Sequence, residues 1–107
     1  MTSEILDDFY EKTTVSFDVY IKKNNVLQTP IGVVSIIFKT NKSDSDEDAV
    51  ISVEAESYTT TSARIALSAP DTAVTPGSYY YEIRWKDDDI EHILLSSTIN
   101  ILERVYD

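Results

Sequence analysis

This 107-residue chain contains no cysteine, only one histidine, two glycines and three prolines. Without cysteine the fold has neither a disulfide nor a thiolate metal site, so its stability must come from packing or from association with other subunits. No run approaches the roughly 18 apolar residues of a membrane-spanning helix, and the start lacks the basic and apolar regions of a signal peptide. We therefore expect a soluble protein that is not exported by a cleaved signal.

Basic residues are also scarce. Nine Lys and Arg residues stand against 19 Asp and Glu residues, which gives a formal net charge of −10 and an isoelectric point near 4.3. Nucleic-acid affinity comes mainly from neutralising phosphates with cationic side chains, and anionic membranes require the same charge. The composition therefore predicts no nucleic-acid partner and no membrane partner.

Alternating apolar and polar residues predict a series of short strands. We expect strands over residues 13–21, 33–39, 49–56, 63–68, 78–86 and 90–102. Turn residues separate these segments, a spacing typical of an antiparallel sandwich. The predicted fold is all-β, an immunoglobulin-like antiparallel β-sandwich of about six or seven strands, in a single domain that spans residues 1–107.

The remaining segments are expected to be connections and ends. Residues 1–12 form either an arm or a short helix, which Thr2 or Ser3 would cap, and residues 103–107 form a polar tail. Residues 41–48 contain four acids and no apolar residue, so we expect a solvated, mobile loop. Residues 57–62 are expected to form a polar turn, and the last strand is expected to bend near Ser96 and Ser97.

The acidic runs suggest a cation site, but their spacing does not fit one. The run that begins at Asp44 has Ala49 where an EF-hand needs glycine and Ala55 where it needs the bidentate glutamate. A looser site at Asp87–Asp89 would require three consecutive side chains to converge on one ion. We expect no metal and no cofactor, and we interpret these acids as solvated turns.

The sequence offers little support for catalysis. His92 is the only histidine and follows Glu91 in a predicted strand, and no G-x-S-x-G motif holds a serine on a sharp turn. A small sandwich rarely holds two carboxylates across a rigid cleft. We therefore predict no catalytic residues and no enzymatic activity; a small hydrolase would need His92.

Tyrosine is abundant, with seven residues. Alternation assigns Tyr79 and Tyr81 to the core, as parts of a structural turn with Pro76 and Gly77. One of these two tyrosines would make a tyrosine corner, in which the hydroxyl hydrogen-bonds to the preceding crossover. Tyr20, Tyr58 and Tyr80 are predicted at the surface as contact residues, and they carry the second hypothesis, a carbohydrate- or receptor-binding module.

Three segments carry a family resemblance. Leu67–Thr72 has the form L-x-x-x-D-T, Pro76–Ile83 has the form P-G-x-Y-x-Y-x-I, and Leu94–Ile101 ends the chain's last strand. With the first strand, this series over residues 14–102 resembles the small β-sandwich domains of tailed-bacteriophage virion proteins, such as the N-terminal domain of baseplate upper proteins and related tail or head-fibre modules. The chain departs from that pattern at Asn24-Asn25, which replaces an N/D-G turn, and at Ser97, which replaces a glycine.

The resemblance implies a function through assembly. It implies a non-enzymatic virion structural protein of the baseplate, tail, head–tail connector or capsid-decorating layer, assembled in the host cytoplasm. Its partners would be other virion proteins and further copies of itself, in a homo-oligomer or symmetric assembly. The family provides no catalytic residues to transfer to this chain.

Overall fold

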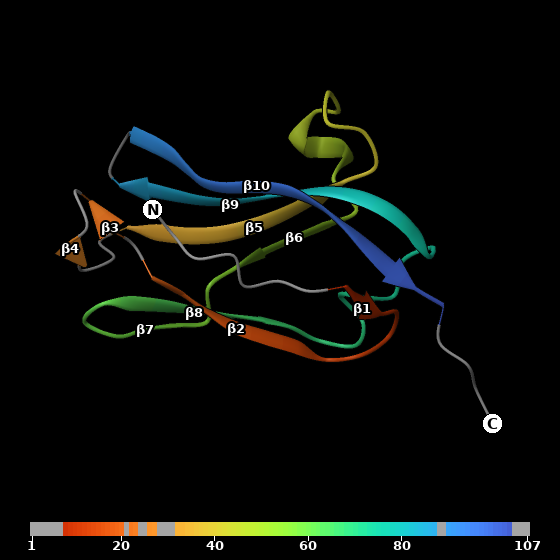
Figure 1. Ribbon diagram of the computed structural model, residues 1–107, viewed down its shortest axis with the longest axis horizontal. Coiled ribbons are helices and arrows are strands. Elements are labelled where there is room, and N and C mark those ends of the chain that lie inside the picture. The colour runs from red at the N-terminus through yellow and green to blue at the C-terminus, as the bar shows by residue number, and fades with distance from the viewer. Residues whose placement is uncertain (1–7, 21, 24–25, 28–31, 88–89, 104–107) are drawn as a thin grey trace.

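We analysed a computed structural model of the chain, and it describes residues 8–20, 22–23, 26–27, 32–87 and 90–103 (Figure 1). These residues form ten strands and one short 3₁₀ helix, η1 (Asp46–Asp48). The strands are β1 (Phe9–Tyr10), β2 (Val15–Tyr20), β3 (Lys22–Lys23), β4 (Val26–Leu27), β5 (Val33–Lys39), β6 (Ile51–Glu54), β7 (Ser57–Tyr58), β8 (Ser62–Leu67), β9 (Gly77–Asp87) and β10 (Ile90–Leu102). No helix in the described ranges is long and apolar enough to span a membrane.

The strands form two main sheets packed face to face (Figure 1). Sheet A has the order β1-β10-β9-β5-β6, and sheet B has the order β2-β8-β7. Across sheet B, the strands β2, β8 and β7 correspond to strands B, E and D of an immunoglobulin-like sandwich. Across sheet A, the strands β10, β9 and β5 correspond to strands G, F and C. All pairs are antiparallel except β1 with β10. The predicted all-β sandwich fold is confirmed.

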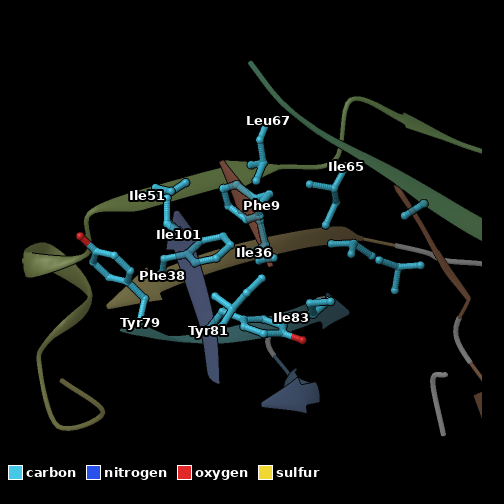
Figure 2. Close-up of a cluster of buried hydrophobic side chains, with 14 residues drawn as sticks. Phe9, Ile36, Phe38, Ile51, Ile65, Leu67, Tyr79, Tyr81, Ile83 and Ile101 are labelled. Atoms are coloured by element: carbon cyan, nitrogen blue, oxygen red, sulfur yellow. The ribbon is translucent and has the colours of Figure 1, made fainter. Parts of the chain in front are cut away.

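The core lies between the two sheets and contains the apolar face of each long strand (Figure 2). Sheet A contributes Val34, Ile36 and Phe38 from β5, while the inward side of β9 contributes Tyr79, Tyr81 and Ile83. Sheet B contributes Val19, Ala63, Ile65 and Leu67. These residues are the ones that period-two alternation assigns to one face, because successive strand side chains point to opposite sides of the sheet.

The described part of the N-terminal segment is strand and not helix. Phe9 and Tyr10 form β1, which pairs in parallel with Ile101 and Leu102, so the helical alternative for residues 9 and 10 was wrong. Residues 1–7 lie outside the described residues, as does the tail beyond Glu103. Phe9 is buried against Phe38, with ring centroids 6.1 Å apart at an interplanar angle of 88°, and this contact holds β1 on the sandwich.

One further prediction was wrong in detail. The segment 57–62 is not only a turn, because Ser57 and Tyr58 form β7 and pair with β8. The first predicted strand ends before Lys22, as expected, and the next described residues pair as the short strands β3 and β4. β10 has a β-bulge between Ile93 and Leu95, where the strand accommodates an extra residue.

Candidate functional site

The predicted structural turn lies at the crossover from sheet B to sheet A. The Tyr79 hydroxyl donates a hydrogen bond to the backbone carbonyl of Thr75, so of the two candidate tyrosines it is Tyr79 that makes the corner contact, while Tyr81 packs beside Phe38. Burial raises the pKa of the Tyr79 hydroxyl. Gly77 begins β9, and a methyl group placed on its Cα would meet nothing within 4 Å, so its role is in the backbone and not in close packing.

Thr72 is the buried centre of this crossover. Its side-chain hydroxyl donates to the Thr13 carbonyl at 2.6 Å and accepts the Thr13 N–H at 2.9 Å. Its own carbonyl accepts the N–H of Lys12 at 3.2 Å, while the preceding Asp71 accepts the N–H and hydroxyl of Ser68. Thr72 of the D-T motif therefore fastens the crossover to the turn between β1 and β2, while Asp71 bonds within the crossover. Sequence reasoning noted the motif but assigned Thr72 no role.

The three predicted surface tyrosines lie apart. Tyr80 points from the outer face of sheet A, opposite in direction to buried Tyr79 and Tyr81, and Tyr20 points from the outer face of sheet B. Tyr58 is 41% exposed, but its hydroxyl accepts the N–H of Val34 at 3.1 Å and so joins the two sheets. The fold therefore does not gather these side chains into one stacking platform.

An open hollow lies beside the tyrosine corner, where the loops at one end of the sandwich meet. It has a volume of about 650 Å³ and is lined by Thr40, Val50 and the segment from Ala73 to Tyr79. Its lining side chains are apolar or hydroxylated, and none of them is charged. The Tyr79 hydroxyl already bonds to the Thr75 carbonyl, so this hollow presents neither an acid–base pair nor an anion-binding group.

The acidic loop after β5 is solvent-exposed, as predicted, and an ion cluster at Asp46 ties it to sheet A. Asp46 accepts two hydrogen bonds from Arg84, at 2.7 and 3.0 Å, and lies 2.9 Å from the Lys39 ammonium. Arg84 also bonds to Glu82 at 2.6 Å. The bonds from Arg84 and then Lys39 hold the pKa of the Asp46 carboxyl well below its usual range.

Two other acids of the loop make hydrogen bonds within the loop. Asp44 accepts the N–H of Asn41, and Asp48 accepts the hydroxyl of Ser45. No group of three or more metal-ligating side chains occurs within the described ranges. The other acidic run extends into Asp88 and Asp89, which lie outside them.

The Asp46 ion cluster predicts that the stability of the fold falls at acidic pH. Because the folded-state pKa of Asp46 is depressed, its contribution to stability is complete above the unfolded pKa of about 3.9 and declines as pH falls toward the folded value. We expect Asp46→Asn to lower the free energy of unfolding at pH 6 by about 1 kcal/mol or less, since the carboxylate is 60% exposed. The difference from the unmodified chain should shrink below pH 4.

Chemical denaturation followed by tryptophan fluorescence, at several pH values, measures this difference. Asp48→Asn is the matched control, because that acid lies in the same loop and, among the described residues, its carboxylate bonds to the Ser45 hydroxyl and forms no ion pair. If both variants show the same pH dependence, the Asp46 cluster does not contribute the acid sensitivity.

His92 lies near the tip of the β9–β10 hairpin. Its ring stacks on Trp85, with centroids 5.0 Å apart and an interplanar angle of 27°, and the two residues are direct cross-strand partners. Among the hydrogen bonds of the described residues, none joins His92 to a serine or an acid. The geometry gives His92 a packing role in the hairpin.

The outer edge of β10 is the most distinctive surface of the molecule. β1 covers it only at Ile101 and Leu102, and the Asp8 carboxylate accepts the N–H of Asn100 at 2.9 Å. Within the described part of the chain, no strand pairs with this edge before Asn100. Figure 1 shows β10 as one of the two longest strands, running the length of sheet A.

The sequence of this strand has few of the features that usually protect an edge. From Ile93 to Leu102 the strand contains no charged residue, no proline and no glycine, and Ile90 and Ile93 are 62% and 51% exposed. Natural edge strands are normally short, charged or covered, because unpaired backbone groups recruit further strands. The sequence showed the uncharged run, but only the strand order identifies it as an edge.

A comparison of the chain with protein-family models, with curated proteins and with solved structures gives no match.

Proposed function

We propose that this chain is a non-enzymatic structural subunit of a tailed-bacteriophage particle, which acts through contacts with other virion proteins. The baseplate, tail, connector and capsid-decorating layer are the positions that the sequence resemblance implies. The observation that carries the assembly role is the uncharged stretch of β10 from Ile93 to Leu102, where the described strands pair with its outer side only at Ile101 and Leu102. Strand addition to such an edge is a common mode of protein recognition, because backbone groups provide the affinity.

The motifs that carry the resemblance have structural roles in this sandwich. Asp71 and Thr72 fasten the crossover, and Tyr79 makes the corner contact that starts β9. Both motifs therefore serve the sandwich itself. A resemblance based on such residues favours a shared sandwich module and assigns no reaction to it.

Carbohydrate or receptor binding, the second hypothesis, receives less support. Sugar sites commonly present an exposed aromatic side chain for stacking, but Tyr20 and Tyr80 lie on opposite outer faces and Tyr58 bonds to Val34. The open hollow beside Tyr79 is uncharged and offers only hydroxyl and backbone groups. Binding to a glycan array that is lost in Tyr80→Ala would favour this hypothesis.

Purified particles provide the test of the virion role. We expect mass spectrometry to detect the chain in particles of the phage whose genome encodes it, in a fixed ratio to the major capsid protein. We also expect it to co-purify with the product of a neighbouring gene for a tail or capsid protein. Particles that are complete and infectious without the chain, and no complex with any neighbouring product, would contradict the proposal.

A further inference from the structure

β2 is an edge strand of sheet B, because the described strands pair with it only on its β8 side (Figure 1). In an immunoglobulin-like sandwich the first strand of the chain lies beside this one and covers its outer edge. Here β1, the first strand, pairs with β10 in sheet A instead. β2 has six residues, while the edge strands on the opposite side, β6 and β7, have four and two. Among the described residues, the edge of β2 is therefore open to strand addition.

Hydrogen bonds on either side of β2 show which of its backbone groups face outward. Thr13, just before the strand, directs its N–H and its carbonyl to the hydroxyl of Thr72, in the segment that follows β8. The carbonyls of Ser62 and Arg64 face β7, so the residues between and after them in β8 face β2. Alternate residues of a strand share one edge. The backbone groups of β2 that face away from β8 are therefore those of Ser16, Asp18 and Tyr20.

We propose that a second copy of this chain adds its own β2 to this edge, antiparallel and around a two-fold axis at Phe17. In this register Ser16 of each copy lies opposite Asp18 of the other. Both residues face outward, so they exchange both backbone hydrogen bonds. Tyr20 lies opposite Thr14 in the same way. The two three-stranded sheets would become one continuous sheet.

Charge favours a second copy at the edge of β2. Each chain carries a net charge of −10, so two copies repel each other over most of their surfaces. The single acid of β2 is Asp18, and the Arg64 guanidinium lies 3.2 Å from its carboxylate and donates to the Ser16 hydroxyl at 3.1 Å. This edge is therefore locally neutral. The register also keeps the two copies of Asp18 from lying directly opposite each other, where like charges destabilise a strand pair.

The inward side of β2 gains apolar contact from the same pairing. Val15 and Phe17 pack against the core but are only half-buried. In the proposed register the two copies of Phe17 are direct cross-strand partners at the axis, and Val15 lies opposite Val19 of the other copy. Aromatic and β-branched pairs of this kind stabilise antiparallel strands. The dimer therefore covers apolar surface that a single chain leaves partly exposed.

This inference rests on the proposed function, because it names one partner of the assembling subunit. The failure of the two can be distinguished, since a monomeric chain can still be found in virions. Conversely, a dimer formed by the purified chain does not depend on any phage protein.

Light scattering of the purified full chain tests the dimer. At about 100 µM we expect twice the chain mass of 12.1 kDa. Ser16→Asp places an acid opposite Asp18 of the other copy, twice in the symmetric dimer, and should raise the dissociation constant at least about tenfold. Ser52→Asp is the matched control, because it adds the same charge at an exposed position on β6, away from β2. It should leave the dimer intact.

Disulfide trapping tests the register, since the unmodified chain contains no cysteine. An equimolar mixture of Ser16→Cys and Asp18→Cys should form a linked dimer in oxidised glutathione, because directly opposite residues lie about 5.5 Å apart. Each variant alone should link far less. Its two thiols are offset by two residues across the axis, at about 7–8 Å, which exceeds the reach of a disulfide.

Circular dichroism of each variant should match the unmodified chain, since both substituted side chains lie on the outer face of sheet B. A monomeric unmodified chain would overturn the proposal. Hydrogen exchange then identifies the occupant, because protected amides at Ser16, Asp18 and Tyr20 of a monomer mean that another segment of the chain covers the edge. A dimer that Ser16→Asp and Ser52→Asp weaken equally, or that each cysteine variant alone links as well as the mixture does, would also overturn it.

Discussion

Replacing Phe38 with alanine is expected to lower the free energy of unfolding by about 4 kcal/mol, the largest single effect that we predict. Phe38 is fully buried and lies at the centre of the core (Figure 2). Its ring packs edge-on against Phe9, with centroids 6.1 Å apart, and at a tilt of 32° against Tyr81, with centroids 5.7 Å apart. The substitution removes apolar burial and leaves a cavity between the sheets, because neighbouring side chains relax only in part.

The Phe38→Ala substitution should also weaken the packing of β1 at the edge of sheet A. Phe9 belongs to β1, which holds the last two residues of β10, and it loses its aromatic partner in this variant. Urea denaturation measures the free energy, with Phe38→Leu as the graded control at a loss of about 1.5 kcal/mol. Equal losses for the alanine and leucine variants would show that the site collapses without a cavity.

Replacing Thr72 with valine should cost about 2 kcal/mol, although the two side chains have nearly the same shape. The valine cannot bond to Thr13, whose N–H and carbonyl both pair with the Thr72 hydroxyl. Thr72 itself is completely buried, so little water reaches its bonding partners. Leaving a buried polar group without a partner costs more than an average hydrogen bond contributes.

Thermal unfolding provides the measurement for this variant. For a domain of this size, 2 kcal/mol corresponds to a decrease in Tm of roughly 10 °C. Thr72→Ser keeps the hydroxyl and loses only a methyl group, so it should remain about 1 kcal/mol more stable than the valine variant. If the serine variant is the less stable of the two, packing of the methyl group determines the role of Thr72 and the hydrogen bonds do not.

The sequence predicted the long strands correctly because each has enough residues for alternation to be visible. Val34, Ile36 and Phe38 were assigned to one face, and all three are buried. The strands that sequence reasoning missed, β1, β3, β4 and β7, contain two residues each. A strand of two residues is too short to show alternation of apolar and polar side chains. Pairing with a neighbouring strand, and not the local sequence pattern, therefore determines where these short strands form.

For the candidate site too, the sequence shows some features and only the structure shows others. The uncharged run at the end of the chain and the D-T and P-G-x-Y motifs are visible in the sequence. Their roles are not, because Thr72 acts on Thr13, 59 positions away, and Arg84 holds Asp46, 38 positions away. The solvated loop that composition predicts is therefore also tied to sheet A, by a cation on a strand distant in the sequence.

What the sequence by itself determined is the class of protein: an acidic β domain without the residues for a disulfide, with faces set by period-two alternation. The tertiary structure decided which strands are neighbours, since alternation defines the two faces of a strand but not its two edges. β1 pairs with only two residues of β10, and that short overlap leaves the preceding edge without a strand partner in the described part of the chain. The surface on which the assembly proposal depends is therefore a consequence of strand order.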